Sequence, residues 1–111
     1  MSFLRGVLDA WQQNIGKPQQ VAALFTEDAI FQGLKPYVTG RQGVADYYAG
    51  QPAGLTVEYR INEVRLLAED VELGWVEATF RFADGRPPVE VNLTMVVTGG
   101  LISHYHVSPR L

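Results

Sequence analysis

The chain has 111 residues, 47% of them hydrophobic, which suits one domain with a single core and excludes a disordered or fibrous segment. Its formal net charge is −3 and its nine lysines and arginines do not cluster, so we expect neither nucleic acid nor an anionic membrane as a partner. It has no cysteine, which excludes disulfides, thiol nucleophiles and zinc sites built on thiolates.

The first half of the chain predicts three helices. Apolar residues recur every three or four positions across residues 2–16, which indicates an amphipathic helix that ends at a glycine. A second helix is predicted at residues 18–28, because a proline suits its first turn and one apolar face continues. A short strand is expected at residues 29–32 and a loop at residues 33–40. Residues 41–48 predict the third helix.

The second half changes to the period of strands. Residues 55–67, 71–82, 89–97 and 101–107 are rich in β-branched and aromatic side chains, and acidic or glycine-containing pairs separate them. This pattern predicts an antiparallel meander with three tight hairpin connections. The expected fold class is therefore α+β, with three N-terminal helices packed on a curved antiparallel sheet in one domain, residues 1–111.

This architecture has consequences for ligands, partners and location. A twisted sheet covered by helices on one side leaves a concave, mostly apolar space, where a small hydrophobic molecule can bind. The other face of the sheet needs cover too, and we expect a homodimer through it. The sequence has no apolar run long enough for a signal peptide or a transmembrane helix, so we expect a cytoplasmic protein.

The only histidines, His104 and His106, belong to the last predicted strand. Alternation places them on one face with Ile102, and places Tyr105 on the more apolar face. We therefore expect Tyr105 to point its hydroxyl into the pocket and the histidines to face a dimer partner or solvent. Two histidines with no carboxylate nearby in the sequence are an incomplete ligand set, so neither a metal nor any other cofactor is predicted.

The strand at residues 89–97 leaves open which of its faces lines the pocket. One face is apolar, and the other carries Asn92 and Thr94. If the apolar row forms the dimer interface, both polar side chains hang into the pocket as neutral hydrogen-bond partners. If the faces are reversed, they are solvated surface residues. Periodicity alone does not decide between these alternatives.

Asp9 is the candidate catalytic acid or base. It lies at the edge of the apolar stripe of the first helix, where a carboxylate half-buried against Trp11 would have a raised pKa. The alternative is an ordinary solvent-facing side chain. Four aromatic residues are expected to line the pocket or to fill it: Trp11, Phe25, Phe31 and Tyr48.

Three segments resemble those of a known superfamily: residues 25–31, 40–48 and 100–108. They look like the signature segments of the nuclear-transport-factor-like superfamily, the cone-shaped α+β fold of ketosteroid isomerases, SnoaL-like polyketide cyclases and the association domain of calcium/calmodulin-dependent kinase. The closing His-x-His-x-Ser pattern is similar to that of the kinase association domain and of small bacterial SnoaL-like proteins. The resemblance spans nearly the whole chain and implies a fold, but that fold carries enzymes, binding modules and assembly domains.

The resemblance also bears on single residues. It places Gly33 where ketosteroid isomerases carry the aspartate that acts as general base, so it implies that steroid isomerase activity is absent. Asp9 and Asn92 fall where the isomerases have their oxyanion-hole tyrosine and aspartate, and neither is the family residue. Tyr48 matches a supporting tyrosine of the isomerases, and Tyr105 falls at a pocket position of the last strand.

Three functions fit these observations. The first is a cofactor-independent isomerase, cyclase or hydratase acting on a hydrophobic carbonyl or phenolic compound, with Asp9 as acid or base and with Tyr48, Asn92 and Tyr105 orienting the ligand. The second is a binding module that recognises such a ligand without turnover. The third is a structural dimer whose cavity is filled by its own aromatic side chains.

Overall fold

The computed structural model describes residues 3–35 and 37–110, and it contains three helices in the described parts of the chain. They are α1 (Phe3–Gln13), α2 (Pro18–Ala22) and α3 (Gly40–Ala49). The first and third lie close to their predicted ranges. The prediction of a helix at 18–28 is wrong beyond Ala22, because Phe25 already begins a strand that pairs with the last strand of the sheet.

Six strands form one sheet in the order β2-β1-β6-β5-β4-β3. Their bounds are β1 (Phe25–Gln32), β2 (Tyr37–Thr39), β3 (Thr56–Ala68), β4 (Val71–Arg81), β5 (Val89–Thr98) and β6 (Leu101–Pro109). The expected meander is present as β3 to β6. The sheet is nevertheless mixed, because β1 runs parallel to β6, and the prediction of a purely antiparallel sheet is wrong there. The connection between β4 and β5 spans residues 82–88 and is not a tight hairpin.

Strand β2 was not predicted, because it lies inside the segment expected to be a loop. It pairs with β1 over three residues only, and its first residue, Tyr37, is exposed. Such a short edge strand carries too little apolar alternation to be recognised from the sequence. Because β2 pairs with β1 and α3 begins directly after it, β2 places the start of α3 beside β1.

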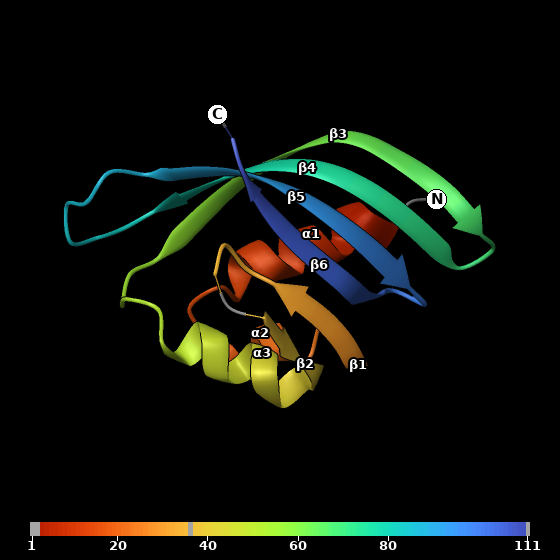
Figure 1. Cartoon of the computed structure of the whole chain (residues 1–111), viewed down its shortest axis with the longest axis horizontal. Helices are drawn as coiled ribbons and strands as arrows, with labels where there is room; N and C mark the ends of the chain where they lie inside the picture. Colours follow the sequence, from red (N-terminus) through yellow and green to blue (C-terminus); the bar gives the residue numbers. More distant parts are fainter. Residues whose placement is uncertain (1–2, 36, 111) are drawn as a thin grey trace.

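The sheet curves around the helices, as Figure 1 shows. Strands β3 to β6 arch over α1, whereas α2 and α3 lie below, beside β1 and β2. The predicted α+β class and curved sheet are therefore confirmed. Most of the buried side chains of the sheet face this concave side, and the core forms between the two layers. In the parts of the chain that the structure describes, no helix is long and apolar enough to cross a membrane.

The structure decides which faces of β5 and β6 are buried. In β5 the apolar alternate residues are buried and Asn92 is exposed on the outer face. In β6, Tyr105 is buried and His106 is exposed, as expected. Ile102 is buried on the same side as Tyr105, contrary to the expected alternation, because Ser103 is an extra residue that shifts the register between β5 and β6.

Candidate functional site

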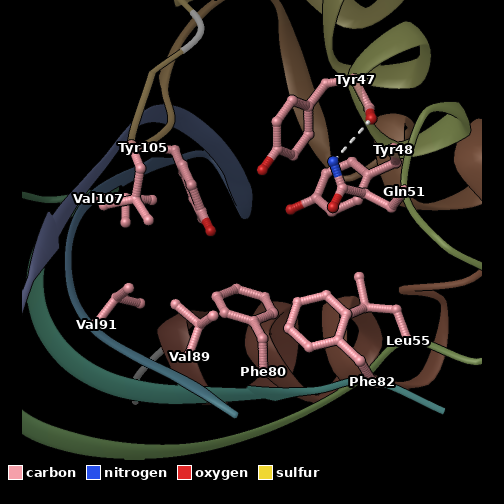
Figure 2. Close-up of a pocket in the computed structure, with 11 residues that line it drawn as sticks. Tyr47, Tyr48, Gln51, Leu55, Phe80, Phe82, Val89, Val91, Tyr105 and Val107 are labelled. Carbon is pink, nitrogen blue, oxygen red and sulfur yellow. Dashed lines mark hydrogen bonds between the residues drawn. The ribbon is translucent and has the colours of Figure 1, made fainter. Parts of the chain in front are cut away.

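A cavity of about 150 Å³ lies between α3 and the concave side of the sheet. Its described lining residues are Leu34, Tyr47, Tyr48, Gln51, Leu55, Phe80, Phe82, Val89, Val91, Tyr105 and Val107. Figure 2 shows most of these side chains around one opening. The walls are mainly apolar, and the polar groups are three tyrosine hydroxyls and one side-chain amide. This is the arrangement typical of a small-molecule site.

Two neighbouring tyrosines reach the cavity from the last turn of α3. Tyr48 faces the core and is only 5% exposed, whereas Tyr47 is half-buried at the side of the helix. Consecutive residues of a helix are about 100° apart, so the two rings enter the cavity from different directions. Figure 2 shows their hydroxyls pointing toward the hydroxyl of Tyr105, which comes from β6. These three groups are called the hydroxyl cluster below.

Hydrogen bonds organise the hydroxyl cluster. The indole Nε1 of Trp11 donates to the Tyr48 hydroxyl oxygen over 2.9 Å, in a buried position. The Tyr105 hydroxyl interacts with the same oxygen. A tryptophan N–H can only donate, so the direction of the first bond is fixed by chemistry. Tyr48 therefore receives a hydrogen bond from behind and presents its hydroxyl to the cavity.

Burial perturbs all three groups of the hydroxyl cluster. Burial raises the pKa of Tyr48 and of Tyr105 well above the usual range of a phenol, and it also raises the pKa of Tyr47. The hydrogen bond from Trp11 opposes this effect at Tyr48 without cancelling it. All three hydroxyls therefore stay protonated at neutral pH, and they are available as neutral hydrogen-bond donors.

Three of the aromatic residues expected to contact a ligand stand behind the lining instead. Trp11, Phe25 and Phe31 are fully buried and do not border the cavity. The Phe31 ring stacks on Tyr105, with centroids 4.4 Å apart and planes inclined by 4°, because the two residues are direct neighbours across β1 and β6. These side chains fill the core and fix the orientation of the tyrosines. They leave the cavity in front of the tyrosines open.

Asp9 lies outside the cavity. Its side chain is exposed and accepts a hydrogen bond from the hydroxyl of Tyr59 in β3. The expectation of a carboxylate half-buried against Trp11 is wrong, because the two residues are two positions apart and point to nearly opposite sides of α1. Desolvation, followed by the contact with Asp9, raises the pKa of Tyr59 to about 12. Asp9 thus belongs to a surface pair and not to the hydroxyl cluster.

The remaining candidate residues are also away from the cavity. Asn92 is exposed on the outer face of β5, so the apolar row of that strand lines the interior and the second sequence alternative applies. His104 and His106 lie on the outer face of β6, with ring centroids 6.3 Å apart. Among the described residues, no group of three or more His, Asp or Glu side chains is placed to hold a metal ion. Gly33 is buried beside the end of β1.

Several lining residues were not predicted. Phe80 shares the inward face of β4 with Ala78, and Phe82 continues the same alternation one residue beyond the end of the strand, so alternation there carried a usable signal. Gln51 follows the end of α3, and its Nε2 donates to the Tyr47 carbonyl oxygen over 3.4 Å. No periodic pattern extends to a residue after a helix end, so only the structure could show that Gln51 lines the cavity.

No protein-family model matches the sequence, and no curated protein matches it closely enough to indicate a family. Solved structures do match. A ketosteroid isomerase-like protein from Erwinia carotovora atroseptica aligns with a TM-score of 0.81 and 15% identity, over 98% of this chain and 95% of that one. A domain of unknown function with a cystatin-like fold from Nostoc punctiforme aligns with a TM-score of 0.78 and 23% identity, over 98% and 74%.

A third similar structure is that of a computationally designed 17-OHP binder, with a TM-score of 0.72, 15% identity, and 100% and 95% of the two chains covered. At these identities the likeness concerns the fold alone. The fold is shared with cystatin-like and ketosteroid isomerase-like structures, so the fold implied by the resemblance of three sequence segments is confirmed. The likeness assigns no activity to this chain.

Proposed function

We propose that this protein binds a small, largely apolar molecule in the cavity between α3 and the sheet, and holds a carbonyl or phenolic oxygen of that molecule at the hydroxyl cluster. The observation that carries the proposal is the meeting of three phenolic hydroxyls, from Tyr47, Tyr48 and Tyr105, in an otherwise apolar cavity. Apolar walls supply affinity through burial, and a few fixed polar groups supply orientation. A similar fold that was designed as a 17-OHP binder supports this use of the scaffold.

A second candidate function is cofactor-independent catalysis in the same cavity, as an isomerase, cyclase or hydratase. The hydrogen bond from Trp11 to Tyr48 favours it, because a hydroxyl that accepts a hydrogen bond becomes a better donor. Donors fixed in a dry site stabilise negative charge that develops on a carbonyl oxygen. In this function Tyr48 acts as the hydrogen-bond donor that stabilises the charge, and Asp9, which lies outside the cavity, is not the acid or base.

Native mass spectrometry of the freshly purified protein tests the binding proposal first, since a retained ligand appears as an added mass. A panel of phenols and cyclic ketones, scored by the shift in melting temperature, tests it independently. Tyr48→Phe should weaken binding by about 1–3 kcal/mol, because it removes one hydrogen-bond partner from a buried site. Tyr37→Phe is the matched control, since Tyr37 is 61% exposed and does not border the cavity.

Turnover separates the two candidates. If a bound ketone or phenol is recovered unchanged after long incubation with the protein, binding without catalysis is the function. Conversion of the ligand, lost in Tyr48→Phe and kept in Asp9→Asn, supports catalysis at the hydroxyl cluster. Conversion that is lost in Asp9→Asn contradicts the assignment to Tyr48.

We propose further that a second copy of the chain covers the outer face of the sheet. Trp75 in β4, Thr94 in β5 and His106 in β6 are direct cross-strand neighbours on this face, and the Trp75 side chain is 38% exposed. An exposed tryptophan on an interior strand of a sheet is a typical anchor of a protein interface. A twofold axis through this row would pair the face with itself.

A further inference from the structure

The dimensions and hydrogen-bonding groups of the cavity restrict the ligand further. We infer that the cavity takes an uncharged molecule with a single ring and one carbonyl oxygen, and that the carbonyl oxygen is held by the hydroxyl cluster. This inference rests on the proposed binding function and narrows the chemical class of the ligand. Three properties of the lining carry it: volume, the count of hydroxyl protons, and charge.

The volume sets the number of rings. Cavities that hold drug-sized ligands have volumes of roughly 300–1,000 Å³. This cavity has about 150 Å³. An engineered apolar cavity of about that size holds one benzene molecule. Phe80 and Phe82 close it from the side of the sheet, and Figure 2 shows both rings facing the three hydroxyls. One ring with a short substituent fills this space, so a fused second ring would have to project out of it into the opening.

The number of free hydroxyl protons in the cluster indicates which polar group the ligand carries. The oxygen of Tyr48 already accepts from Trp11, so one of its lone pairs is used. In a hydrogen bond between Tyr48 and Tyr105, one hydroxyl donates its proton and the other accepts it. Only one of their two hydroxyl protons is therefore used, whichever residue donates. The other proton, together with that of Tyr47, is left for a ligand. A carbonyl oxygen has two lone pairs and no proton, so it matches this surplus of donors better than an alcohol does.

The lining sets the charge. Among the described residues that border the cavity, none is acidic, basic or a histidine. A carboxylate placed in such a site would lose its hydration without gaining a counter-charge, which is costly. The desolvation that raises the pKa of the buried tyrosines would act on a ligand anion in the same direction. The ligand is therefore expected to be neutral.

Isothermal titration calorimetry with five related probes tests the inference. Acetophenone carries the ring and the carbonyl, 1-phenylethanol replaces the carbonyl with an alcohol, ethylbenzene lacks the oxygen, benzoate adds a charge, and 1-tetralone adds a fused ring. Acetophenone should bind at least about tenfold more tightly than each of the other four. In Tyr48→Phe, acetophenone should lose its advantage over ethylbenzene, while Tyr37→Phe should keep it.

The outcomes separate this inference from the proposed function. Benzoate or 1-tetralone binding as tightly as acetophenone overturns the inference and leaves small-molecule binding intact. An equal affinity for acetophenone and 1-phenylethanol overturns the assignment of a carbonyl. If none of the five probes binds and native mass spectrometry shows no retained molecule, the proposed function itself is wrong. The ranking of probes on the unmodified protein decides the inference even where Tyr48→Phe does not fold.

Discussion

Tyr48 and Tyr105 are the residues at which burial has the clearest chemical consequence. Both are buried phenols in contact with other aromatic rings, and the hydroxyl of Tyr48 also accepts from Trp11. Their raised pKa values mean that the folded protein holds them protonated where an unfolded chain would begin to release the protons. The free energy of unfolding should therefore depend on alkaline pH.

The sign of this dependence follows from linkage. Below about pH 10, the ordinary pKa of tyrosine, Tyr48 and Tyr105 are protonated in both the folded and the unfolded protein, so the free energy of unfolding keeps its full value. As the pH rises further, the unfolded chain loses protons that the folded protein keeps, so stability should fall by up to about 1.4 kcal/mol per pH unit for each such tyrosine. Urea unfolding between pH 8 and about pH 11 checks this, because Tyr48→Phe should show a shallower fall. An equal slope in the two proteins would contradict the assignment.

At the scale of elements, the packing of α1 on β4 shapes the cavity from behind, because α1 carries Trp11. Two features of β4 hold the start of this helix. The buried carboxylate of Glu72 accepts the backbone N–H groups of Phe3 and Leu4 at 2.8 and 2.9 Å. Two residues later, Gly74 leaves room for the Leu4 side chain. The two hydrogen bonds of Glu72 join residues nearly seventy positions apart in the sequence.

Two glycines, Gly74 at this contact and Gly6 on the exposed side of α1, should respond in opposite ways to alanine. A Cβ at Gly74 would lie 2.4 Å from a methyl carbon of the buried Leu4, so Gly74→Ala should destabilise the fold by about 1–3 kcal/mol. Gly6 is an exposed position of α1 with no atom within 4 Å of an added Cβ, so Gly6→Ala should stabilise it by about 0.5–1 kcal/mol. Denaturant midpoints measure both. A stabilising Gly74→Ala would show that α1 does not approach β4 this closely.

At the scale of the whole molecule, the curved sheet uses its concave side for the core and the cavity, and the proposed dimer uses its outer side. Size-exclusion chromatography with light scattering should give the mass of a dimer, and Trp75→Lys should give that of a monomer, because a charge at the centre of an interface is not compensated. Leu66→Lys is the control, since Leu66 is exposed near the end of β3. A monomeric unmodified protein would contradict the proposed pairing.

The sequence alone determined the class of fold. Hydrophobic spacing placed α1, α3 and the four long strands, because each of these elements buries one continuous apolar face and therefore carries its own period. It also placed Tyr105 toward the interior and His106 outward. The short elements were predicted less well. The start of α2 at Pro18 was predicted but its end was placed too late, because β6 supplies a pairing partner that draws residues from Phe25 onward into a strand. Strand β2 was missed, because three residues are too few to show a period.

Only the tertiary structure decided the candidate site. Alternation gave the two faces of β5 without saying which is buried, and only the packing of the helices shows that the apolar row faces the interior and Asn92 the outside. Asp9 and Trp11 belong to one helix, yet only packing shows that one faces solvent and the other the core. The hydroxyl cluster joins residues from α3 and β6, and the physical reason it could not be foreseen is that a cavity is the space left between elements, which no local pattern records.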